Sequence, residues 1–152
     1  LDQPDVTHLF FGTGDGRILT FFVTEDRPSN RQPPMGVGSV HHLAFQVAAE
    51  ELQEIKRALD DDGREFSEFD RGAFHSLYTR DNNGLTIELV ADKFPVPDEH
   101  RGEVLALAQK HRVADGADYV DDEHMRAAID ELGLDVAQKE IPDAPTGVGY
   151  EE

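Results

Sequence analysis

The stretch SVHHLAFQVAAEELQEIKRALDDDG, at residues 39–63, contains a strand followed directly by a helix. Its apolar and aromatic start predicts a strand over residues 40–47. In residues 48–63, apolar side chains recur at helical spacing, acidic residues fill the first turn and a glycine ends the run. We expect this helix to pack its apolar face against the strand.

Three more strands are predicted after this helix, at residues 64–69, 74–80 and 85–92. The turn Asp-Asn-Asn-Gly at residues 81–84 joins the last two of them. Residues 40–92 therefore have the order strand–helix–strand–strand–strand, abbreviated βαβββ.

An internal repeat relates this unit to the beginning of the chain. THLFFGTGDGRILTFF, at residues 7–22, aligns with FHSLYTRDNNGLTIEL, at residues 74–89, if one residue is gapped in the turn. We therefore divide the chain into the final two strands of an N-terminal module, a linker, a βαβββ module and a helical acidic tail, at residues 1–25, 26–38, 39–93 and 94–152. The tail should contain two polar helices, near residues 98–112 and 121–132. We expect its histidines, at positions 100, 111 and 124, to lie on solvated faces.

Charge is the strongest signal in the composition. The 152 residues include 32 acidic and 14 basic side chains, for a net charge of −18, and no cysteine. This field repels nucleic acid and anionic membrane, so we expect neither as a partner. Because the acids are spread along the whole chain, they favour a salt-rich cytoplasm as the habitat. Without thiolates, a metal must be held by imidazole and carboxylate groups.

Strand alternation indicates which side chains share a face. His42 alternates with small or polar neighbours, and Glu88 lies mid-strand on the polar side of its own strand. A carboxylate there is costly to bury unless it is paired, hydrogen-bonded or bound to metal. If the two strands are neighbours, His42 and Glu88 line one cavity and suit Fe²⁺, Mn²⁺ or Zn²⁺. The alternative is a solvent-facing Glu88 and a histidine with an ordinary structural role.

The doubled histidine of VHHLAFQV and the segment SLYTRDNNGLTIELVAD, at residues 76–92, resemble the vicinal oxygen chelate superfamily. This superfamily includes glyoxalases, bleomycin-resistance proteins and extradiol dioxygenases. The closer likeness is to two-module ring-cleaving dioxygenases that act on hydroquinone-type substrates, and it covers about residues 1–95. It implies an α+β fold of paired βαβββ modules, here with the first module incomplete and a C-terminal helical tail added.

The resemblance also implies site residues. It makes His42 and Glu88 metal ligands, with Fe(II) as the expected ion and Mn(II), Zn(II) or Ni(II) as alternatives. It makes His41, Arg71 and Tyr78 candidates for contacting substrate or supporting the ligands. Arg71 would hold a phenolate or another anion, and Tyr78 and His41 would pass protons. His41 falls on the apolar face by alternation, so it reaches the site only if the strand begins irregularly.

One ligand of the superfamily pattern is missing. The second histidine of these enzymes comes from the first strand of the first module, and this sequence lacks that strand. The chain begins with Leu1 rather than methionine, so we expect a processed or truncated piece. A second copy of the chain could supply the third ligand, since these modules pair edge to edge, and so could His8 or His75. The remaining alternative is a site without a third protein ligand.

These observations lead to one main function and two alternatives. The main hypothesis is a metal-dependent dioxygenase, or a fragment of one, that takes a small aromatic diol as substrate and acts as a homo-oligomer such as a dimer. The first alternative is a glyoxalase-like isomerase or lyase. The second is a metal-free module that sequesters small aromatic molecules, as bleomycin-resistance proteins do.

Overall fold

The computed structural model of the protein describes residues 6–14, 16–25 and 36–141. Most of the predicted linker and the two ends of the chain, residues 1–5 and 142–152, lie outside the described residues. The described elements, in chain order, are β1 (Thr7–Gly12), β2 (Ile18–Val23), β3 (His42–Gln46), α1 (Ala49–Asp61), β4 (Ser67–Asp70), β5 (Phe74–Arg80), β6 (Thr86–Asp92), α2 (Asp98–Asp115) and α3 (Asp122–Glu131). The α+β class and the βαβββ order over β3 to β6 are confirmed.

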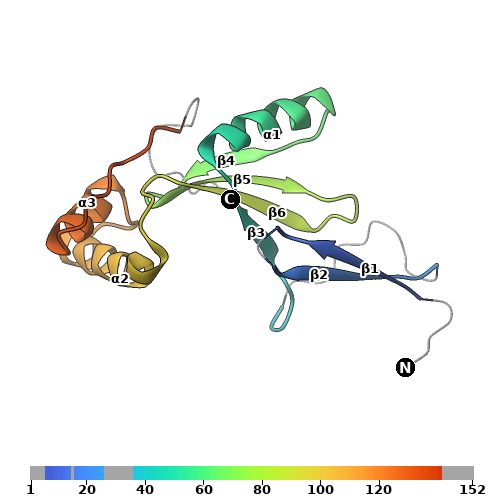
Figure 1. Cartoon of the computed structure of the whole chain (residues 1–152), viewed down its shortest axis with the longest axis horizontal. Helices are drawn as coiled ribbons and strands as arrows, with labels where there is room; N and C mark the ends of the chain where they lie inside the picture. The colour runs from blue at the N-terminus through green and yellow to red at the C-terminus, as the bar shows by residue number, and fades with distance from the viewer. Residues whose placement is uncertain (1–5, 15, 26–35, 142–152) are drawn as a thin grey trace.

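A four-stranded sheet forms the centre of the molecule, in the order β3-β6-β5-β4. β3 runs parallel to β6, and the other two pairs are antiparallel. Because β3 and β4 occupy opposite edges, the chain between them must cross the sheet, and α1 covers one face as it does so (Figure 1). Leu52 of α1 is fully buried there against Leu77 and Ala91. Burial of one leucine side chain contributes about 1.5–3 kcal/mol.

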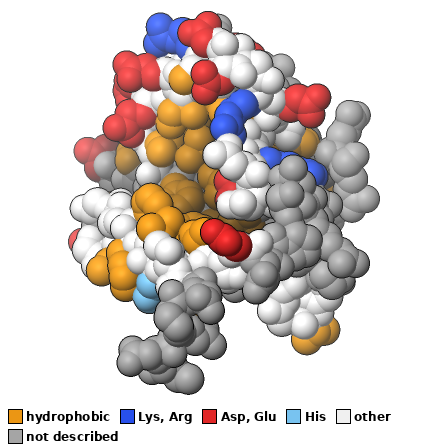
Figure 2. All heavy atoms as spheres, turned by 90° about the vertical axis from the view of Figure 1, so that its right-hand side faces the viewer, with side chains coloured by type: hydrophobic (Ala, Val, Ile, Leu, Met, Phe, Trp, Pro, Cys, Tyr) orange, Lys and Arg blue, Asp and Glu red, His pale blue; other side chains and the backbone are white. Residues whose placement is uncertain are grey.

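β1 and β2 form a separate antiparallel hairpin beside β3 (Figure 1). Figure 2 looks at this side of the molecule and shows hydrophobic side chains gathered in the middle of the face, with acidic ones along its upper margin. Large apolar side chains of the hairpin are exposed, namely Leu9, Phe10, Phe11, Ile18, Phe22 and Val23. That this hairpin ends an N-terminal module stays a prediction.

α2 and α3 pack against each other and against one end of the sheet (Figure 1). The expectation that the tail histidines face solvent is wrong for His124, whose exposed fraction is 4%. Its ring caps the start of α3, since Nδ1 accepts the backbone N–H of Asp121 at 3.0 Å. None of the described helices is long and apolar enough to cross a membrane.

Candidate metal-binding site

His42 and Glu88 lie together on the sheet face opposite α1. In the parallel register, His42 pairs with Thr86 and Ala44 pairs with Glu88, so the two side chains are near neighbours on one face. His42 Nε2 lies 2.8 Å from Glu88 Oε2. The Glu88 side chain is 7% exposed and that of His42 is 32% exposed, so the pair joins a buried carboxylate to an accessible imidazole.

Two hydroxyl groups complete the surroundings of Glu88. Ser76 Oγ and Tyr78 OH each donate to Glu88 Oε1 at 2.6 Å. With His42, they give the buried carboxylate three partners, which offsets much of the cost of its desolvation. Ser76 is not among the residues predicted from the sequence. Strand alternation could have identified it, because Ser76 precedes Tyr78 by two positions and therefore shares its face.

His41 reaches the site through His42 and not through the sheet face. It is exposed and lies just before the first residue of β3, where strand alternation does not yet apply. His41 Nδ1 lies 2.7 Å from His42 Nδ1. The Glu88 carboxylate accepts from His42 Nε2, which leaves His42 Nδ1 as an acceptor for a proton on His41. The three side chains therefore form one hydrogen-bonded row.

Arg71 and Tyr78 flank this row. The Arg71 guanidinium carbon lies 4.7 Å from the Phe69 ring centroid and 5.7 Å from that of Tyr78. The Tyr78 ring also meets the His42 ring edge to face at 5.8 Å. Burial, and then the hydrogen bond to Glu88, raise the pKa of Tyr78 above its ordinary value of 10.0. At neutral pH the Tyr78 hydroxyl therefore keeps its proton and acts as a hydrogen-bond donor.

The donor atoms of His42 and Glu88 have the spacing that a divalent ion requires, but they supply only two protein ligands. Two ligands at adjacent corners of an octahedron, each about 2.1 Å from an ion, are themselves about 3 Å apart, close to the observed 2.8 Å. However, nowhere in the described ranges do three or more His, Cys, Asp or Glu residues form a group that could hold a metal. Any third protein ligand must come from outside these ranges or from another chain.

The two histidines considered as a third ligand lie elsewhere. His75 pairs in register with Ala91 on the α1 face of the sheet, and its Nε2 lies 3.1 Å from Glu68 Oε2. It is therefore on the wrong side of the sheet for Glu88. His8 lies in the hairpin, where its ring stacks on Phe22 with centroids 4.1 Å apart. Neither histidine joins His42 and Glu88 in a three-residue cluster.

Tyr78 also lines a cavity of about 540 Å³. Arg64 and Arg80 line the same cavity, together with Glu65, Phe66, Ser67, Thr79 and Thr86. Its volume lies within the range of about 300–1,000 Å³ that is usual for small-molecule sites. A larger cavity, of about 980 Å³, separates the β1–β2 hairpin from β3 and the start of α1.

The βαβββ order of β3 to β6 is the one expected for a vicinal oxygen chelate module, and comparison with known proteins supports a relationship to this superfamily. No family model matches the sequence. The chain is 29% identical over 130 residues to a chlorohydroquinone/hydroquinone 1,2-dioxygenase from Sphingobium indicum. That match covers 82% of this chain but 39% of the dioxygenase, so the chain spans about two fifths of the length of this relative.

A solved structure, a glyoxalase/dioxygenase from Nostoc punctiforme, is also similar, with a TM-score of 0.47 and 23% identity. That similarity covers 56% of this chain and 60% of the other. The match to the hydroquinone dioxygenase bears out the superfamily relationship that the sequence motifs indicate.

Proposed function

We propose that this chain supplies two metal ligands of a ring-cleaving dioxygenase that acts on hydroquinone- or catechol-type diols. The observation that carries the proposal is the contact between His42 Nε2 and the buried Glu88 carboxylate. The sequence similarity to a chlorohydroquinone/hydroquinone 1,2-dioxygenase supports this choice of substrate class.

In this proposal, His42 and Glu88 hold a divalent metal, with Fe(II) as the first candidate and Mn(II), Zn(II) or Ni(II) as alternatives. A bound ion would supply Lewis acidity and a template for the diol and oxygen. With a metal bound, His42 Nε2 would carry no proton, so its Nδ1–H would donate to His41 Nδ1 and keep the ring oriented toward the ligand site. The third protein ligand comes from a second copy of the chain or from residues outside the described ranges.

The remaining residues bind the substrate and move protons. The cavity beside Tyr78 accommodates a single aromatic ring. The Arg71 guanidinium, held near the Tyr78 ring, provides a cation for a phenolate oxygen of the diol. The Tyr78 hydroxyl keeps its proton at neutral pH, and in this proposal it passes that proton from its hydrogen bond with Glu88 to a reacting oxygen.

The test is oxygen uptake by the full chain loaded with Fe(II) under nitrogen and then given hydroquinones and catechols in oxygenated buffer. We expect uptake by the wild type and none by Glu88→Gln, which removes the ligand charge. Mn(II) titration should show at least about 100-fold weaker binding by Glu88→Gln, since loss of even a supporting group costs about 10–100-fold.

Glu68→Gln is the matched control. It makes the same change in the other histidine–glutamate pair of the sheet, on the α1 face. We expect it to keep both Mn(II) affinity and oxygen uptake. No oxygen uptake by folded, Fe(II)-loaded wild type would overturn the dioxygenase proposal. Isomerase or lyase activity with Ni(II) or Zn(II) and without oxygen would instead identify the glyoxalase-like alternative.

A metal-free binding module is the second candidate, and one observation favours it. Ser76, Tyr78 and His42 already satisfy the Glu88 carboxylate without an ion. This candidate predicts that affinity for small aromatic molecules is unchanged after chelator treatment and in Glu88→Ala. The dioxygenase proposal predicts that both treatments weaken diol binding.

A further inference from the structure

The two-helix tail shares a hydrophobic core with one end of the sheet. Ala73 lies in the loop before β5, while Phe94 and Val96 follow β6. All three belong to one buried cluster with residues of α2 and α3, namely Val104, Ala108, Met125, Ala128 and Ile129. The tail is therefore packed against the loop that connects β4 to β5.

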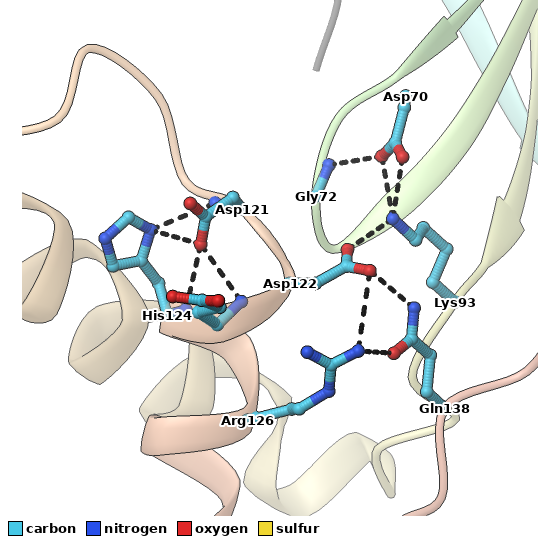
Figure 3. Close-up of polar contacts among 9 residues, drawn as sticks. Asp70, Gly72, Lys93, Asp121, Asp122, His124, Arg126 and Gln138 are labelled. Carbon is cyan, nitrogen blue, oxygen red and sulfur yellow. Dashed lines mark hydrogen bonds and ion pairs between the residues drawn. The ribbon is translucent and has the colours of Figure 1, made fainter. Parts of the chain in front are cut away.

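A buried lysine links the same loop to α3 (Figure 3). The Lys93 side chain is 8% exposed, and its Nζ lies 2.9 and 2.8 Å from the two carboxylate oxygens of Asp70, the last residue of β4. The same ammonium contacts Asp122, the first residue of α3. Gln138 donates to the other oxygen of Asp122 at 2.5 Å. One lysine thus joins β4 to the tail, and the loss of either carboxylate removes one of the two ion pairs that make this connection.

Gly72 brings the loop into direct contact with the segment before α3. Its φ is +74°, in the left-handed region that favours glycine. A Cβ at this position would overlap the carbonyl oxygen of Val120 and lie 2.8 Å from its carbonyl carbon. The Gly72 N–H also donates to Asp70 Oδ1 at 2.8 Å. The loop is therefore held by the tail on one side and by the Lys93–Asp70 pair on the other.

Arg71 is the residue between these two anchors. Its backbone N–H donates to the Phe74 carbonyl at 2.9 Å, and its carbonyl accepts the Ala73 N–H at 2.9 Å. With its main chain fixed in this way, its guanidinium lies over Phe69 and beside Tyr78 at the candidate site.

We propose that the two-helix tail positions Arg71 at the candidate site, with Lys93, Asp122 and Gly72 as the positioning residues. Lys93 and Asp122 set the end of β4 relative to α3, and Gly72 allows the loop to approach Val120. This inference rests on the proposed function for the role of Arg71 toward a diol, but the placement of Arg71 can be measured without any activity.

The first measurement is the NMR spectrum of the full chain. The Phe69 and Tyr78 rings shift the Arg71 side-chain signals by their ring currents, so these signals report where the guanidinium lies. We expect Asp122→Asn to move the Arg71 signals most of the way toward those of an exposed arginine. Gly72→Ala, which keeps every charged group of the ion cluster, should do the same, and it decides the question if Asp122→Asn does not fold.

The second measurement is kinetic. In Asp122→Asn, KM for hydroquinone should rise several-fold while kcat changes little. In an Arg71→Ala background, the same substitution should have no further effect on KM. As a conservative variant, Lys93→Arg, whose guanidinium can hold both carboxylates, should retain the wild-type Arg71 signals.

Glu131→Gln is the matched control, because it removes an acidic partner of His111 within the tail without touching the loop. We expect wild-type Arg71 signals and a wild-type KM for this variant. Unchanged Arg71 signals in folded Asp122→Asn and Gly72→Ala would overturn the inference. Absence of oxygen uptake by the wild type would overturn the proposed function alone, since the NMR result does not depend on it.

Discussion

The sheet carries two histidine–glutamate pairs that differ in what surrounds them. Glu68 contacts His75 and also the Lys56 ammonium at 2.6 Å, and the His75 side chain is 1% exposed. Glu88 contacts His42 and two neutral hydroxyls, and its imidazole partner is accessible. A carboxylate already paired with an ammonium has little capacity for a metal ion, so we expect a structural role for the first pair and propose the second as the ligand-binding one.

His75 gives the first pair a pH dependence. Burial lowers its pKa below the ordinary value of 6.5, and the neighbouring Glu68 only partly opposes this shift. Between its folded-state pKa and 6.5, the unfolded chain binds more protons at this site than the folded chain. The contribution to stability is therefore complete above pH 6.5 and falls as the pH drops toward the folded pKa, by up to about 1.4 kcal/mol per pH unit.

Urea unfolding between pH 5 and pH 8 checks this expectation. His75→Asn should lower the stability at every pH but remove this part of the slope below pH 6.5. His111→Asn, at the half-buried surface of α2, serves as the control and should keep the slope. An equal slope in wild type and His75→Asn would show that another group causes the acid sensitivity.

Among the secondary structure elements, β5, its turn and β6 were the easiest to predict. β5 occupies the predicted residues 74–80, and β6 begins one residue after the predicted position. The reason is local: Asp81 accepts the backbone N–H groups of Asn83 and Leu85, and Gly84 has the positive φ that this turn requires. Such turn chemistry is readable from four adjacent residues.

The sequence predicted the candidate site only through strand alternation, which indicates the side of a strand on which each residue lies. Alternation assigned His42 and Glu88 each to the polar side of its own strand, and the parallel pairing of β3 with β6 brings these two sides onto one face. Alternation could not reveal the ion cluster of Lys93 with Asp70 and Asp122, because the two aspartates are far apart in the sequence and meet only through tertiary packing. For the same reason His124 looked like one more polar residue of the tail.

The start of α3 offers a test at the level of a single element. Asp121 caps this helix, since its Oδ1 accepts the backbone N–H groups of Glu123 and His124, each at 3.0 Å. Asp121→Ala should therefore destabilise the protein by about 1 kcal/mol. Asp130→Ala, the same change near the other end of α3, removes an acid from the negative end of the helix dipole and should be neutral or slightly stabilising.

Denaturant unfolding of the two variants compares them directly. If Asp130→Ala cost as much as Asp121→Ala, the capping hydrogen bonds would not explain the loss. Because α3 anchors the loop that carries Arg71, the Asp121 variant should also shift the Arg71 signals if the tail frays.

Across the whole molecule, the net charge of −18 is the main electrostatic feature. Acidic groups gather even where they oppose local structure: α1 ends in a run of aspartates at residues 60–62, and its last turn has no basic residue. Carboxylates at a helix C-terminus are unfavourable, since the backbone carbonyls there already carry partial negative charge. The positive partners that could compensate are few, and several of them are used in the buried pairs.

Added salt should therefore stabilise this protein. At 0.1 M salt the Debye length is about 10 Å, and at 1 M it is about 3 Å, so repulsion between surface carboxylates is largely removed over that range. Surface ion pairs are also weakened, but each contributes about 1 kcal/mol or less. We expect thermal unfolding in KCl to show Tm rising between 0.1 and 1 M by roughly 3 °C or more, equivalent to about 1 kcal/mol.

Asp61→Lys separates charge screening from a general effect of salt on hydrophobic burial. It replaces an exposed acid at the negative end of α1 by a cation, so Tm should rise in 0.1 M KCl and the gain should shrink in 1 M KCl. A gain that is equal at both concentrations would come from something other than screened charge. A wild-type Tm that falls as KCl is added would mean that the attractive ion pairs at the surface outweigh the repulsion among the surface acids.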